Sequence, residues 1–325
     1  MADARGSGVP ARTALLAVRP EVAKVVVGQD HVLSGLVTAL LVQGHVLLEG
    51  VPGVAKTLLV KALAAALDVQ SRRVQFTPDL MPADVLGQSI LEQRAGTASF
   101  RFRPGPVFTN LLLADELNRT PPRTQAALLE AMEERQVTVE GLPRDLPDPF
   151  LVIATQNPVD YEGTYPLPES QLDRFLFKLL VAYPGAEEEQ AILARHDRGL
   201  DPHDLASTGI AAVAGPHQLA AARAEIGTIR CEQAVLAYVV SIVRATRASP
   251  SLSLGASPRG AAMLLRAAKA WAWLSGRDYV TPDDVQALAR PTLRHRLLLR
   301  PELELEGATA DGVLDGILAA VPVPR

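Results

Sequence analysis

The chain has 325 residues, a formal net charge of −4 and a hydrophobic content of 48%. This length predicts two domains or one large one, and the charge gives no whole-chain indication of nucleic-acid binding. A single cysteine, Cys231, excludes an intramolecular disulfide and fits a reducing compartment. The N-terminus has no secretory pattern, and the longest apolar stretch, 32–48, is interrupted at 43–45. We therefore expect a cytoplasmic protein without a membrane span.

Helices and strands are expected to alternate up to about residue 184. A flexible N-terminus, 1–10, precedes them. Helices are predicted over 11–27, 30–42, 56–67 and 120–135, and strands over 45–49, 73–76, 111–116, 150–155 and 175–181. Such alternation is typical of a parallel sheet covered by helices on both faces. We predict an α/β core over 11–184 with a five-stranded parallel sheet.

The pattern changes after residue 184, because the rest of the chain is rich in helix-forming residues and shows little strand signal. Helices are predicted over 186–198, 216–225, 232–247, 258–274 and 282–290. We expect a smaller, all-helical lid domain over 185–325.

A phosphate-binding loop is indicated between the strand 45–49 and the helix that follows. Residues 50–57 read GVPGVAKT, in the strand–turn–helix context that a P-loop needs. Lys56 can reach the β- and γ-phosphates, and the Thr57 hydroxyl can bind Mg²⁺. Ala55 replaces the second glycine of the general pattern, which predicts ordinary backbone angles there. Alone, the match could equally be a helix that starts after a tight turn.

An apolar run ends in two acids at Asp115 and Glu116. The carboxyl end of a buried parallel strand is where open α/β sheets bind ligands. Asp115 can hold Mg²⁺ through water, and Glu116 can orient and deprotonate the attacking water. The acids could otherwise simply end the strand, but the upstream P-loop favours nucleotide hydrolysis.

Three further polar residues fit a nucleotide hydrolase. Asn157 follows the strand 150–155 and could orient water, or it could be a turn residue. Arg174 could be a surface residue or an arginine finger that reaches a neighbouring subunit. Arg259, at the start of a predicted helix, could touch the phosphates of its own chain.

Taken together, these segments resemble the MoxR-type members of the AAA+ ATPases. The matching segments span most of 27–299; they are 50–57, 115–122, 125–141, 153–163, 167–175 and 257–259. In this family the P-loop commonly has alanine at the position of Ala55. The resemblance implies ATP hydrolysis with Mg²⁺ in a homo-oligomeric ring, usually a hexamer. It also implies a client protein and a partner with a von Willebrand factor A domain.

The resemblance assigns roles to residues that match the family motifs. It implies Lys56 and Thr57 as Walker A ligands, and Asp115 and Glu116 as Walker B residues. Asn157 corresponds to sensor 1, Arg174 to the arginine finger acting in trans, and Arg259 to sensor 2. The nucleotide contacts that it implies are Gly28 and Gln29 near adenine, and Gly50, Pro52, Gly53, Val54, Ala55, Lys56, Thr57 and Leu58 around the phosphates.

Two hairpin insertions are expected near 88–107 and 136–149. Residues 99–103 read SFRFR, which alternates aromatic and basic side chains as a strand does, and Ala95-Gly96 could form the turn. The second hairpin would turn at Glu140-Gly141. The first resembles the helix-2 insert of one AAA+ branch, and the second resembles the pre-sensor-1 hairpin. In relatives such ribbons line or cap the ring pore and contact substrates or partners, although both could be plain exposed ribbons.

Several functions stay open at this stage. The resemblance favours chaperone-like remodelling or maturation of a client, including insertion of a metal cofactor. The alternatives are a chelatase-type motor subunit, a helicase-type nucleic-acid motor and a scaffold that binds nucleotide but barely hydrolyses it. The acidic balance argues against the nucleic-acid motor, and Glu116, Asn157 and Arg174 argue against the scaffold.

Overall fold

A parallel five-stranded sheet forms the centre of the α/β part of this computed structural model, which describes residues 9–51, 53–94, 97–157, 164–201 and 204–324. The strand order is β2-β5-β8-β1-β9, and every pairing within this sheet is parallel. The strands are β1 (Val46–Gly50), β2 (Ser71–Gln75), β5 (Leu111–Asp115), β8 (Leu151–Gln156) and β9 (Phe177–Val181). The predicted fold class is confirmed.

Both faces of the sheet are buried, which explains the continuous apolar runs. Leu111 and Leu113 belong to one hydrophobic cluster, whereas Leu112 and Ala114, which alternate with them, belong to the other. The helices of the α/β part are α1 (Ala11–Leu16), α2 (Val18–Val22), α3 (Asp30–Leu41), α4 (Lys56–Ala66), α5 (Pro82–Leu86), α6 (Pro122–Glu134) and α7 (Glu169–Leu172), with a 3-10 turn, η1 (Leu117–Arg119).

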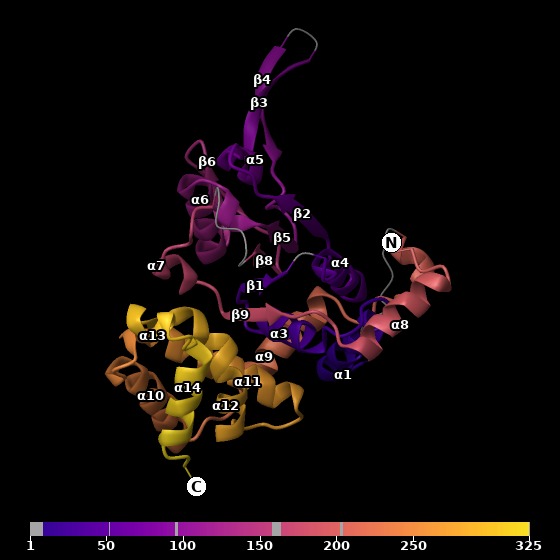
Figure 1. The fold of residues 1–325 in the computed structure, drawn as a ribbon. Coiled ribbons are helices and arrows are strands. Elements are labelled where there is room, and N and C mark those ends of the chain that lie inside the picture. The colour runs from indigo at the N-terminus through magenta and orange to yellow at the C-terminus, as the bar shows by residue number, and fades with distance from the viewer. Residues whose placement is uncertain (1–8, 52, 95–96, 158–163, 202–203, 325) are drawn as a thin grey trace.

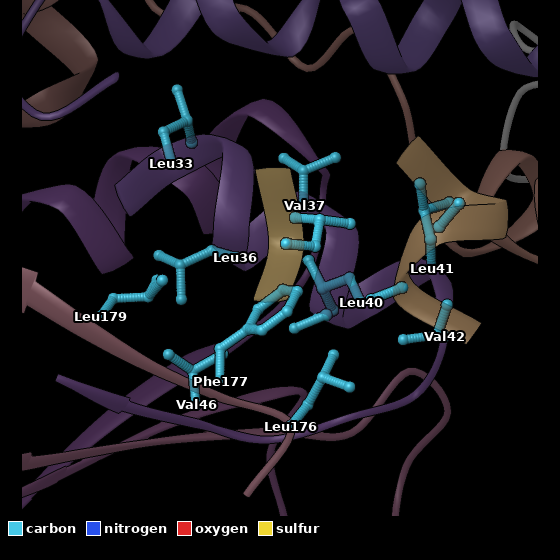
Figure 2. Close-up of a cluster of buried hydrophobic side chains, with 14 of the residues drawn as sticks. Leu33, Leu36, Val37, Leu40, Leu41, Val42, Val46, Leu176, Phe177 and Leu179 are labelled. Carbon is cyan, nitrogen blue, oxygen red and sulfur yellow. The ribbon is translucent and has the colours of Figure 1, made fainter. Parts of the chain in front are cut away.

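Helix α3 shows how one face is covered. Its residues Leu36 and Leu40 lie against Val46 of β1 and Phe177 of β9 (Figure 2). Full burial of an aliphatic or aromatic side chain contributes about 1.5–3 kcal/mol, so this cluster fixes the helix over β1, which leads into the P-loop, and over the neighbouring strand β9.

The first predicted helix and the start of the helix predicted over 120–135 differ from the sequence prediction. The helix expected over 11–27 is broken into α1 and α2 near Ala17, because Pro20 lacks the N–H that a continuous helix needs. Helix α6 begins at Pro122, not at Pro121, and Pro121 takes the extended N-cap conformation that was expected of Thr120.

Most of the helical part lies below the sheet in Figure 1 and packs against α3 and β9, whereas its first helix lies at the right of the view. Its helices are α8 (Ala186–Asp197), α9 (Pro216–Gly227), α10 (Gln233–Ala248), α11 (Pro258–Leu274), α12 (Pro282–Leu293), α13 (Pro301–Leu305) and α14 (Ala310–Ala320), with the 3-10 turns η2 (Leu205–Thr208) and η3 (Arg294–Arg296). A small ribbon of β10 (Leu252–Leu254) and β11 (Leu298–Leu299) interrupts it, and α13 and α14 were not predicted. A domain boundary at 184 stays a prediction.

Both predicted hairpins are present. The first pairs β3 (Gly87–Arg94) with β4 (Thr97–Pro104) and extends away from the sheet (Figure 1); the second pairs β6 (Gln136–Val139) with β7 (Leu142–Asp145). Glu140 and Gly141, with φ of 54° and 76°, form the expected turn of the second hairpin. The expected turn at Ala95-Gly96 lies outside the described residues. The guanidinium of Arg144 lies 3.8 Å from the ring centroid of Phe102, so the hairpins contact each other.

His45, just before β1, joins two layers of the core. Its Nε2 lies 3.0 Å from the Met132 carbonyl at the end of α6, and its Nδ1 accepts from the Val152 N–H at 3.0 Å. The ring is therefore neutral, with the proton on Nε2. Burial lowers the pKa of His45 to about 4, and the nearby charge of Arg135 adds to this effect.

Acid should therefore destabilise the fold through His45. Above pH 6.5 the ring is neutral in both states; between pH 6.5 and about 4 only the unfolded chain takes up the proton, so stability falls as the pH falls. We expect a loss of roughly 3 kcal/mol from this group. Urea denaturation at pH 7 and pH 4.5 measures it. The variant His45→Gln should lose most of that pH dependence, and an unchanged dependence would assign the effect to other groups.

Candidate nucleotide-binding site

The P-loop runs from the end of β1 to the start of α4. A Cβ atom on Gly50 would lie 2.3 Å from the Val181 carbonyl oxygen, so only glycine fits beside β9. Gly53 has φ +84°, a conformation that favours glycine. Lys56 Nζ donates to the Gly50 carbonyl at 2.7 Å. These contacts fix both ends of the loop. Pro52 lies outside the described residues.

Ala55 departs from its sequence expectation. It takes the left-handed conformation, with φ 57° and ψ 23°, directly before the first residue of α4. The expectation of ordinary backbone angles was wrong, because the chain must still reverse sharply to enter the helix. A left-handed alanine carries a strain of roughly 1–2 kcal/mol.

Relieving that strain should stabilise the protein. We expect Ala55→Gly to raise the free energy of unfolding by about 0.5–1 kcal/mol, since the greater freedom of glycine in the unfolded chain offsets part of the gain. Urea denaturation without nucleotide measures this difference. Ala65→Gly, inside α4, is the matched control and should lower stability by about 1 kcal/mol. A loss of stability at both positions would contradict the strain at Ala55.

A cavity of about 690 Å³ opens above the P-loop. The residues predicted to bind nucleotide that line it are Gln29, Gly50, Gly53, Val54, Ala55, Lys56, Thr57 and Leu58. Helix α8 closes another side with Ile192, Arg195 and His196, which the motif search did not single out. The cavity thus lies between the α/β part and the first helix beyond residue 184.

Gly28 lines an adjoining cavity of about 220 Å³ together with Gln29. It has φ +75°, and a Cβ there would lie 2.6 Å from Oε2 of Glu188 on α8. Gln29 is 5% exposed, and its Oε1 has no hydrogen-bond partner in the described part of the chain. A buried acceptor without a partner fits a site that a nucleotide base completes.

The two acids lie at the carboxyl end of β5, beside the P-loop. Asp115 Oδ1 accepts from Thr155 Oγ1 at 2.6 Å, and the same hydroxyl accepts from the Glu116 N–H at 2.9 Å. Thr155, at the end of β8, therefore fixes both acids relative to the neighbouring strand.

Strand β2 supplies further partners for the acids. Arg73 donates to Asp115 Oδ2 from Nη2 at 2.7 Å, and Gln75 Nε2 donates to Glu116 Oε2 at 2.6 Å. Sequence reasoning missed Arg73, Gln75 and Thr155. The sequence shows only that residues 73 and 75 lie on the same face of a predicted strand. Their contact with the acids depends on the pairing of that strand with β5.

The chemistry of the cavity fits a triphosphate and a divalent cation. Lys56 supplies positive charge, although burial lowers its pKa against the opposing effect of Asp115, Glu116 and Glu49. Thr57 and Asp115 offer the oxygen donors that Mg²⁺ prefers, and Asn157 lines the same cavity. Lys56, Thr57, Asp115, Glu116 and Asn157 are thus brought together as the sequence predicted.

The two predicted arginines do not line this cavity. Arg174 Nη1 lies 3.1 Å from Glu133 Oε2, and Arg259 Nη1 lies 3.2 Å from Glu133 Oε1, on the side formed by α6, α7 and the start of α11. The expectation that Arg259 touches its own chain's phosphates is not met in this arrangement. Beyond α8, the helical part packs on α3 and β9. No residue of α11 lines the cavity.

A P-loop, a Walker B acid pair on a central strand and a helical lid define an AAA+ ATPase. Residues 45–177 match the family model of ATPases associated with various cellular activities (AAA), and residues 244–317 match that of the AAA lid domain. The chain is therefore a nucleotide-binding protein that hydrolyses ATP.

The relatives narrow the class to one family. The chain is 42% identical to the chaperone MoxR1 of Mycobacterium tuberculosis, over 94% of this chain and 81% of the relative. It is 49% identical to the uncharacterised protein YeaC of Bacillus subtilis, over 93% and 92%. A crystal structure of a candidate ATPase from Cytophaga hutchinsonii superposes with a TM-score of 0.89 at 39% identity, covering 97% of this chain and 96% of that one. The chain belongs to the MoxR family.

Proposed function

We propose that this chain assembles into a homo-oligomeric ring, a hexamer, and hydrolyses ATP at sites that two neighbouring copies share. The observation that carries this proposal is that the polar residues predicted to act on ATP lie at two separate places on the chain. The cavity is lined by Lys56, Thr57, Asp115, Glu116 and Asn157. Arg174 and Arg259 lie together elsewhere on the surface. Two partly exposed arginines beside a single glutamate suit the phosphates of another copy.

Each group in the cavity has a role in this reaction. Lys56 binds the phosphates, and Glu116 orients and deprotonates the attacking water while Asn157 holds that water in place. Thr57 and, through water, Asp115 would hold Mg²⁺, which when bound neutralises charge on the phosphates. Arg174 and Arg259 of the next copy stabilise the charge that develops on the transferred phosphoryl group.

The work done by this ATPase is chaperone-like remodelling or maturation of a client protein, including metal-cofactor insertion, with a partner that carries a von Willebrand factor A domain. The name of the Mycobacterium relative supports a chaperone role. The first hairpin supports client contact, because its cross-strand pair Leu91 and Phe100 is exposed by 62% and 75% on a ribbon that extends from the sheet (Figure 1). In the described part of the chain, no helix has the length and apolar character needed to cross a membrane.

Assembly should control turnover if the sites are shared. We expect ATP turnover per chain to rise with protein concentration and to follow the fraction of assembled chain, because an isolated copy lacks both arginines at its own cavity. Parallel sedimentation and phosphate-release measurements test this. A turnover per chain that stays constant from isolated copies to the full assembly would contradict the shared site.

A further inference from the structure

The two arginines that would complete a neighbour's site come from different parts of the fold. Arg174 follows α7 in the α/β part, and Arg259 lies in the first turn of α11 in the helical part. Glu133 nevertheless holds both, with one carboxylate oxygen 3.1 Å from Arg174 and the other 3.2 Å from Arg259. They therefore form one cluster.

Asp173 connects the supports of the two arginines. Its Oδ1 lies 2.7 Å from Arg296 Nε, and its Oδ2 accepts from Ser257 Oγ at 3.1 Å. Ser257 is the N-cap of α11, since its Oγ accepts from the Gly260 N–H at 3.2 Å. Asp173 directly precedes Arg174. Its carboxylate thus links this part of the chain to the N-cap of the helix that carries Arg259.

Arg296, in η3, holds the backbone on both sides of Arg174. Its Nη2 donates to the carbonyl oxygens of Asp173 at 2.9 Å and of Phe175 at 2.6 Å. Its side chain is 1% exposed. A Cβ on Gly260 would lie 2.9 Å from Arg296 Cδ, so the absence of a side chain at Gly260 leaves room for the arginine stem.

A buried arginine is a poor source of stability, because desolvation offsets most of the attraction to its partner. Burial accordingly lowers the pKa of Arg296 to about 10, even though Asp173 opposes that effect. What the planar guanidinium supplies is geometry, because its N–H groups form a rigid fork that fixes several acceptors at once. At this position the acceptors include the Asp173 carboxylate and the two carbonyls on either side of Arg174.

We propose that Arg296 is a positioning residue for ATP hydrolysis, which acts through Asp173 and Ser257 to hold Arg174 and Arg259 as a single unit toward the neighbouring copy. This role rests on the shared site proposed above. Arg296 is buried and does not line the cavity of its own chain. Its loss should impair the site of the next copy in the ring while the P-loop of its own chain stays competent.

The test uses assembled full-length chains and three measurements: nucleotide affinity, turnover, and recovery in mixed rings. In Arg296→Lys, which keeps the charge and loses the fork, we expect turnover to fall at least tenfold and nucleotide affinity to change less than twofold. Mixing with Lys56→Ala chains should restore activity, because those chains supply intact arginines to intact P-loops. The recovery should equal that of Arg174→Ala mixed with the same partner.

The matched control is Arg290→Lys on α12, whose exposed ion pair with Asp315 lies outside this network; it should keep wild-type turnover. Wild-type turnover in Arg296→Lys would overturn the proposal. So would a loss that Lys56→Ala chains do not rescue while they rescue Arg174→Ala, because that result indicates a general structural defect. If Arg174→Ala is not rescued either, the shared site itself is wrong and the positioning role is rejected with it.

A second variant covers the case in which Arg296→Lys does not assemble. Ser257→Ala removes the hydrogen bond from α11 to Asp173, together with the N-cap bond to the Gly260 N–H. We expect a loss of turnover of about threefold to tenfold, as for a helix cap that contributes about 1 kcal/mol, with the same recovery in mixed rings. Unchanged turnover in assembled Ser257→Ala rings would overturn the proposal.

Discussion

Replacing Glu116 by glutamine should lower kcat by about 10²–10⁴-fold while nucleotide affinity stays within about twofold of wild type. Glutamine keeps the size of the side chain and can still pair with Gln75, which lies 2.6 Å from Glu116 Oε2. It cannot take a proton from water, so the cavity should bind ATP and fail to turn it over.

Single-turnover phosphate release and equilibrium binding of a fluorescent ATP analogue separate these two effects. Glu304→Gln, an exposed acid on α13, is the control and should leave both values unchanged. Turnover close to wild type in Glu116→Gln would remove Glu116 from the role of base. A parallel loss of binding would instead indicate that Glu116 mainly shapes the cavity.

Much of this site could be predicted because its chemistry is local in the sequence. The segment 50–57 contains its own strand end, turn and helix start, and Asp115 and Glu116 end a strand whose apolar run reveals its burial. The carboxyl ends of parallel strands meet at one edge, so two local motifs are enough to place these side chains around one cavity.

The remaining features depend on contacts that sequence spacing does not encode. The partners of the acids, Arg73 and Gln75, follow from the register between β2 and β5, and strand pairing is not visible in one sequence. The position of Arg259 depends on which face of the sheet the helical part covers. The left-handed Ala55 reflects the path of the loop, which overrides the preference of its residue type.

Replacing Arg174 by alanine should have the largest effect on turnover. An arginine that stabilises the charge of a transferred phosphoryl group is worth about 10³–10⁵ in rate. Arg174 is 31% exposed, donates to the Leu129 carbonyl at 3.0 Å and pairs with Glu133, so in the isolated chain its guanidinium stays on the surface beside α6. The loss should therefore appear in kcat of the assembled protein, whereas binding of nucleotide to the chain's own cavity should stay unchanged.

Arg259→Ala should follow the same pattern with a smaller loss, because the first arginine still reaches the phosphates. The control is Arg230→Ala, which breaks an exposed ion pair with Asp278 in the helical part and should change neither value. Lys56→Ala gives the opposite signature, since its charge acts inside the cavity and its removal weakens nucleotide binding directly. If Arg174→Ala weakened nucleotide binding by isolated chains as much as Lys56→Ala does, Arg174 would serve its own cavity. Loss of kcat alone, with recovery in rings mixed with Lys56→Ala chains, would place it at the cavity of the next copy.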